Sequence, residues 1–121
     1  MAQTIKVPDD AGPYDVGLSI GRFPFDWELY DYTRTEAGWS RKRLAAGSNL
    51  LLVRLPAQSR AELAGHSLVW SVTLLDLDEE TRTTELTVSL LGPGKKPSVV
   101  TASFDAVPER PHLFVTVEVI A

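Results

Sequence analysis

The chain of 121 residues contains no cysteine, a single methionine and only two histidines. Because cysteine is absent, disulfide bonds and thiol chemistry are excluded, and a reducing cytosol is permitted. No apolar run approaches the ~20 residues that span a bilayer. The first ten residues also lack the apolar core of a signal peptide. These absences predict a soluble cytoplasmic protein with no membrane partner.

Positive charge is scarce as well. The chain has 12 Lys and Arg residues against 16 Asp and Glu residues, and its formal net charge is −4. Nucleic-acid binding relies on Lys and Arg to displace the counterions of phosphate groups, so we expect no nucleic-acid partner. The one compact basic run, Arg41-Lys42-Arg43, is short and is typical of a solvated turn or rim.

The sequence is rich in alternation of apolar and polar residues with a period of two, which is typical of half-buried β-strands. This alternation is clear over residues 14–20, 68–74, 85–90 and 113–120. Further strands are expected over residues 3–7, 27–33, 49–55 and 98–104. The run from Leu50 to Val53 is apolar on both faces, which predicts a central strand or one that a partner covers.

One helical segment is expected. Ser59 and Glu62 have the spacing of a capping box and Gly65 can end a helix, so a short helical connection is predicted near residues 57–64. Eight prolines and eight glycines divide the rest into short segments. The sequence therefore predicts an all-β fold, a single antiparallel β-sandwich domain over residues 1–121 with about 7–9 strands. A small β-barrel is the alternative.

Motifs for nucleophilic catalysis and zinc binding fit poorly. Gly17-Leu-Ser19-Ile-Gly21 has the form of a hydrolase nucleophile motif, but it lies in an alternating strand rather than at a strand-to-helix turn. His66 and His112 stand at the starts of expected strands without a second histidine at ligand spacing. We therefore expect both histidines to be ordinary strand-end residues. We also expect that the protein is not an enzyme.

An acidic turn separates two of the clear strands, and its carboxylates are Asp76, Asp78, Glu79 and Glu80. Alternating carboxylates on a loop can supply oxygen ligands to Ca²⁺, but that ion takes roughly six to eight of them, so a second loop must contribute. A solvated turn that discourages edge association is the more favoured interpretation. The turn is a weak calcium candidate, and no cofactor is expected.

Six of the ten aromatic residues form an aromatic cluster in the sequence between Phe23 and Trp39. Aromatic side chains commonly anchor cores and binding surfaces, so this segment is expected to decide fold, function or both. Strand parity divides it, with Phe25, Trp27 and Leu29 expected to face the core. The residues expected on a protein-binding or ligand-binding surface are Tyr30, Tyr32, Trp39, Glu28, Asp31 and Arg34.

The final strand is apolar on its second face too, at Phe114 and Ile120. A two-sheet sandwich needs one apolar face per sheet, so this surplus favours association with another chain. The leading hypothesis is a non-catalytic protein-interaction or structural module in a homo- or hetero-oligomeric assembly, such as an adaptor or a virion or secretion-type component. The alternative is a small-ligand module, for which carbohydrate fits best, with Ca²⁺ at the acidic turn. A hydrolase using Ser19 is the least favoured hypothesis.

Overall fold

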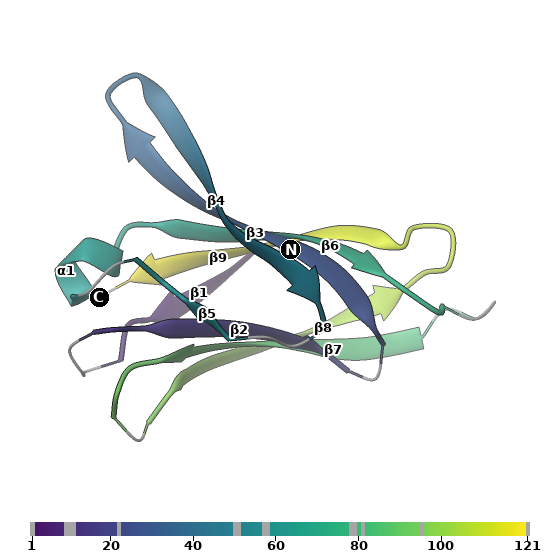
Figure 1. Cartoon of the computed structure of the whole chain (residues 1–121). Helices are drawn as coiled ribbons and strands as arrows, with labels where there is room; N and C mark the ends of the chain where they lie inside the picture. The colour runs from purple at the N-terminus through teal and green to yellow at the C-terminus, as the bar shows by residue number, and fades with distance from the viewer. Residues whose placement is uncertain are drawn as a thin grey trace.

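Two β-sheets pack face to face in the computed structural model, which describes residues 2–8, 12–21, 23–49, 52–56, 59–77, 80, 82–94 and 96–120 (Figure 1). The five-stranded sheet has the order β1 (Ala2–Lys6), β9 (His112–Ile120), β6 (Ser67–Leu74), β3 (Phe25–Thr35) and β4 (Gly38–Ser48). The four-stranded sheet has the order β5 (Val53–Arg54), β2 (Asp15–Ile20), β7 (Arg82–Leu91) and β8 (Ser98–Ala106). The predicted all-β sandwich is confirmed, and the described strands do not close into a barrel.

The pairing is antiparallel with one exception, because β1 runs parallel to β9 with Ala2 opposite Thr116 and Lys6 opposite Ile120. The confirmed antiparallel sandwich therefore contains one parallel strand pair at this edge. After β1 the chain crosses to the four-stranded sheet and forms β2. No hairpin therefore joins β1 to β9, the strand beside it. A parallel neighbour requires such a long connection, and local sequence patterns do not reveal it.

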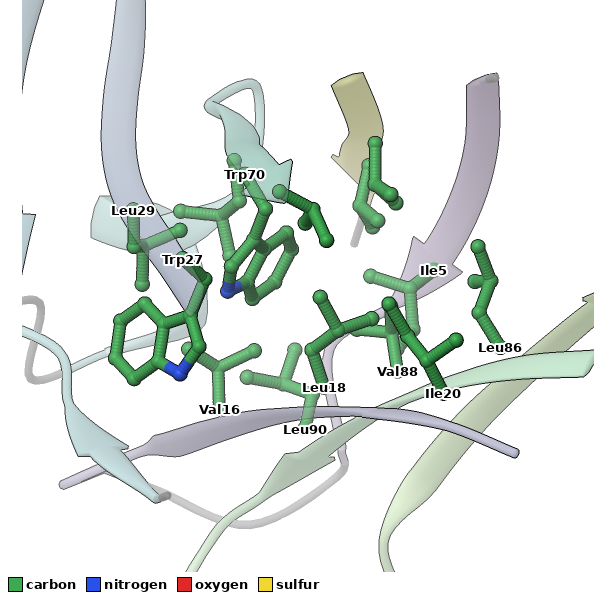
Figure 2. Packing of buried hydrophobic residues seen from close by; sticks show 14 of the residues in the cluster. Ile5, Val16, Leu18, Ile20, Trp27, Leu29, Trp70, Leu86, Val88 and Leu90 are labelled. Carbon is green, nitrogen blue, oxygen red and sulfur yellow. The ribbon is translucent and has the colours of Figure 1, made fainter. Parts of the chain in front are cut away.

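Alternating apolar residues fill the space between the sheets. Trp27, Leu29 and Trp70 come from the five-stranded sheet and point toward Val16, Leu18 and Leu90 of the other (Figure 2). On β9 the buried residues are Val115, Val117 and Val119, with half-buried Leu113 packed against the core. The predicted parity of the clear strands is therefore confirmed, since opposite faces of each strand divide into core and surface.

The β3–β4 hairpin extends away from the sandwich (Figure 1). β6 pairs with β3 only as far as Tyr32, whereas β4 continues to pair with it as far as Thr35. The 11-residue β4 was not predicted, and the basic run Arg41-Lys42-Arg43 lies inside it rather than in a turn. The alternation is lost because β4 is an edge strand largely exposed on both faces, with a register shift opposite Leu29 and Tyr30.

Asn49 joins the end of β4 to the start of β3. Its φ of 58° lies in the left-handed region, which asparagine tolerates better than most residues. The Phe25 N–H donates to Asn49 Oδ1 at 3.2 Å, and the Asn49 N–H donates to the Phe25 carbonyl at 2.7 Å. The indole N–H of Trp27 donates to the Asn49 carbonyl at 2.7 Å, so the one polar atom of this buried ring has its partner.

Of the two alternatives predicted for Leu50–Val53, the central strand is wrong for the described residues, and a strand that a partner covers stays a prediction. Leu50 and Leu51 lie outside the described residues, while Leu52 is exposed and β5 is a two-residue edge strand. The short helix is confirmed as α1 (Arg60–Leu63), with the Glu62 N–H donating to Ser59 Oγ at 3.2 Å. The part of the chain that the structure describes holds no helix with the length and apolar character that crossing a membrane needs.

Candidate binding surface

The solvent-facing side of the five-stranded sheet is called the outer face. In an antiparallel ladder directly opposite residues share a face, so the register places Arg34 beside Trp39 and Tyr32 beside both Arg41 and Ser67. The same register continues across β6 to β9 and sets Val69 beside Thr116 and Ser71 beside Phe114. The outer face therefore gathers residues from four strands, including five of the six predicted surface residues: Tyr30, Tyr32, Trp39, Glu28 and Arg34.

The six aromatic residues of the segment from Phe23 to Trp39 do not form a cluster in space. Phe25 and Trp27 are buried between the sheets, whereas Tyr30, Tyr32 and Trp39 lie on the outer face. Among the described residues, no two rings of this segment are in ring contact, and the ring pair on the outer face is His112 with Phe114 at 5.2 Å. The expected aromatic cluster is thus wrong, because strand alternation sends neighbouring rings to opposite faces.

Charged side chains hold the two tyrosines instead. The Tyr30 hydroxyl donates to the Glu28 carboxylate, and this hydrogen bond raises the pKa of Tyr30 above its ordinary value. The Arg41 guanidinium lies 5.0 Å from the centroid of the Tyr30 ring. Arg41 also hydrogen-bonds to the side chain of Tyr32, and this contact raises the pKa of Arg41. One arginine therefore connects both rings, through a cation–π contact and a hydrogen bond.

The same pattern extends toward the hairpin tip. The guanidinium of Arg34 lies 5.8 Å from the ring centroid of Trp39, and Arg43 approaches Glu28 with 3.9 Å between Nη2 and Oε1. Trp39 remains 59% exposed. Each contact is weak by itself at an exposed site, about 0.5–1 kcal/mol for a cation–π pair. Together they limit the orientations that these side chains adopt.

A shallow groove of about 510 Å³ crosses the outer face, and its lining residues are Tyr32, Trp39, Ser67, Val69, Phe114 and Thr116. The side chains that β6 contributes, Ser67 and Val69, are short. Tyr32 and Trp39 stand on one side of them and Phe114, 59% exposed, stands on the other. The groove therefore forms because small side chains on a central strand lie between large ones on its neighbours.

Asp31 does not belong to this surface. It follows Leu29 by two positions, so its side chain lies on the opposite side of β3, where it is largely buried. His66 Nδ1–H donates to Asp31 Oδ1 at 2.8 Å, and Thr33 Oγ1 lies 3.4 Å from the same nitrogen. Sequence reasoning treated His66 as an ordinary strand-end residue and missed this pair. The parity of Phe25, Trp27 and Leu29 could have placed Asp31 on the inward side.

The remaining candidates among the described residues are not brought together into a site. The described residues contain no group of three or more His, Asp or Glu side chains that could hold a metal ion, and Asp78 and Glu79 lie outside them. Asp76 and Glu80 are exposed. Ser19 lies inside β2 opposite Thr87, so its motif forms no nucleophile elbow. His112 contacts Ser71 and Thr73 at 3.1 and 3.0 Å, which occupies both ring nitrogens.

No protein-family model, curated protein or solved structure matches the chain, so its geometry alone carries the functional argument.

Proposed function

We propose that the chain is a non-catalytic protein-binding module whose outer face holds a protein partner within an assembly. The observation that carries the proposal is the uncovered apolar groove between Trp39 and Phe114. Soluble proteins seldom leave several large apolar side chains together in water, and such groups mark interaction sites. Interfaces are also enriched in tryptophan, tyrosine and arginine, which are the residue types that Trp39, Tyr32 and Arg41 bring to this face.

The contacts among these side chains favour binding. Ordering a mobile side chain on association costs about 0.5–1.5 kcal/mol. Tyr30 is held by Glu28 and Arg41, and Trp39 is held by Arg34, before any partner arrives. Part of that ordering cost has therefore already been met on folding, which supports the use of these rings as anchors.

The charges beside the groove indicate the chemistry of the partner. Arg34, Arg41 and Arg43 lie along the β3–β4 side of the outer face. Glu28 is near Arg43 but is also the acceptor for Tyr30, so positive charge exceeds negative charge there. A protein surface that inserts an apolar side chain into the groove and sets carboxylates beside the arginines would be complementary to it.

Photo-crosslinking tests the proposal. A photoreactive benzoylphenylalanine replaces Val69 on the groove floor, and the matched control carries it at Thr87, on the outer side of the four-stranded sheet. We expect irradiation in an extract of the source cells to capture a partner from position 69 only. Equal capture from both positions would contradict a specific surface.

The captured partner is then purified, and its dissociation constant is measured against the wild type and three variants. Trp39→Ala, Tyr30→Ala and Phe114→Ala should each fold normally and weaken binding, with losses near 2 kcal/mol, about 30-fold, at the strongest anchor. Leu52→Ala is the control, because Leu52 is 58% exposed but lies outside the groove lining. Unchanged affinity in all three outer-face variants would refute the proposal.

Carbohydrate remains the second candidate ligand. Trp39 and Tyr32 line one groove, and exposed aromatic faces of this kind can stack on sugar rings while Arg34 and Glu28 meet hydroxyl groups. A glycan array separates the two functions. Binding to a defined glycan that Trp39→Ala abolishes would favour this candidate, whereas the absence of binding to any glycan on the array would refute it.

A further inference from the structure

β8 is an open edge of the four-stranded sheet. It pairs with β7 from Ser98 opposite Leu90 to Ala106 opposite Arg82, and no described strand pairs with its other side. In an antiparallel ladder every second residue directs its N–H and C=O groups away from the paired neighbour. Alternate residues of the nine-residue β8 therefore present a row of backbone donors and acceptors on which another strand can form hydrogen bonds.

β8 lacks the proline and the basic residues with which proteins often protect such an edge, and β1 of the other sheet lies close to it without pairing with it. The strand reads Ser-Val-Val-Thr-Ala-Ser-Phe-Asp-Ala and contains no proline, lysine or arginine. The other sheet edges are different. β4 carries three consecutive basic residues and a register shift, β5 has two residues, and β1 has five. β8 is the long edge that has strand-forming residues and a single charge, Asp105.

We propose that a second copy of the chain adds its β8 antiparallel to this β8, which joins the two four-stranded sheets into one. A two-fold axis perpendicular to the sheet keeps the core side of each copy on the same side. Full overlap of the nine residues then requires that Ala102 lie opposite Ala102 of the second copy. The proposal concerns a different sheet from the outer face and does not depend on the function proposed for that face.

This register gives complementary pairs along the strand. Val100 lies opposite Phe104 of the second copy on the core side, and pairs of aromatic and β-branched residues stabilise neighbouring strands. Thr101 lies opposite Ser103 on the solvent side, where two hydroxyl groups can hydrogen-bond. Asp105 lies opposite Val99 and not opposite itself. No like charges therefore face each other across the axis.

The core side of β8 also has apolar surface that a second copy would cover. Val100, Ala102 and Phe104 pack against the core but are only partly buried, whereas Ala106 at the end of the strand is fully buried. On the solvent side Val99 is 54% exposed. A strand added at this edge would extend both faces of the sheet and bury these groups further.

Charge placement tests the proposal directly. Thr101→Lys with Ser103→Lys sets lysine opposite lysine at both solvent-side pairs, whereas Thr101→Lys with Ser103→Glu sets lysine opposite glutamate in the same register. Ser40→Lys on β4 is the charge control, since Ser40 is exposed on an edge strand of the other sheet. Circular dichroism confirms that each variant is folded.

Sedimentation equilibrium then measures the mass of each variant over a range of concentrations. Wild type, Ser40→Lys and the Lys–Glu variant should approach twice the 13.3 kDa of one chain as concentration rises. The Lys–Lys variant should dimerise about tenfold more weakly or worse, because like charges directly opposite destabilise strand pairing. A wild type that stays monomeric at every concentration, or a dimer that the Lys–Lys variant leaves unchanged, overturns the proposal.

Crosslinking provides a second measurement that needs no charge change in the strand. The chain has no cysteine, so Ala102→Cys carries one thiol per copy, placed on the proposed axis. Cα atoms of opposite residues lie about 4.5–5.5 Å apart, which suits a disulfide bond. Mild oxidation should give a covalent dimer from Ala102→Cys and none from Ala46→Cys on β4 at the same concentration. Absence of that dimer, or equal dimer from both variants, overturns the pairing.

Discussion

Trp27 and Trp39 belong to the same hairpin and differ in burial, so replacing each by alanine separates core from surface in one experiment. Trp27 is 5% exposed and Trp39 is 59% exposed. A buried aromatic side chain removes about 150–250 Å² from water. At about 25 cal/mol per Å² this contributes roughly 4–6 kcal/mol, close to the roughly 3–5 kcal/mol measured when large aromatic residues in cores become alanine.

Trp27→Ala should therefore cost about 4–5 kcal/mol of unfolding free energy, and it also leaves the Asn49 carbonyl without the indole donor. A loss of this size approaches the whole stability of a marginal domain, so Trp27→Phe serves as the variant that keeps the fold. It keeps a smaller aromatic ring in the core and loses the 2.7 Å hydrogen bond, which predicts a cost of about 1–2 kcal/mol. Trp39→Ala loses mainly its contact with Arg34 and should cost about 1 kcal/mol or less.

Urea unfolding followed by far-ultraviolet circular dichroism measures these free energies without depending on tryptophan fluorescence. The expected order of stability is wild type, then Trp39→Ala, then Trp27→Phe, then Trp27→Ala. If Trp39→Ala lost as much stability as Trp27→Ala, Trp39 would be a core residue. The proposed binding surface would then lose one of its principal anchors.

Two further predictions concern the pKa of Tyr30 and the backbone conformation at Gly21. Because the hydrogen bond to Glu28 raises the pKa of Tyr30, the stabilising contact is complete below the ordinary value of 10.0 and is lost as pH rises through the raised pKa. The difference between the 295 nm absorbance titrations of the wild type and Tyr30→Phe gives the titration of Tyr30 alone, whose midpoint should lie above 10.0 and return toward 10.0 in Glu28→Gln. A Tyr30 midpoint that is not raised would contradict the contact. Gly21 has a φ of 40°, and an added Cβ would lie 2.0 Å from Thr84 Oγ1, so Gly21→Ala should lower unfolding free energy by about 1–3 kcal/mol in urea titrations. Adding Thr84→Ala should restore only the steric part, and a Gly21→Ala variant as stable as the wild type would refute the strain.

Local alternation determined most of the fold class. A strand with one face in the core must alternate, so β2, β6, β7 and β9 could be recognised from their own residues. The capping spacing of Ser59 and Glu62 was equally local and located α1. β4 could not be found in this way, because a largely exposed edge strand places little of itself in the core and shows no such pattern. The parallel pairing of β1 was hidden for a related reason, since it depends on a strand at the far end of the chain.

The candidate surface likewise has one part that the sequence predicted and another that only the tertiary structure assembled. The sequence by itself determined that Tyr30 and Tyr32 share one side of their strand, because parity is a property of neighbouring residues. Only the tertiary structure brought Val69 and Phe114 beside them, since strand order and register depend on contacts between segments far apart in the chain. The same long-range packing left β8 at an edge. Which residues face outward is therefore a local matter, whereas which of them meet is decided by the whole fold.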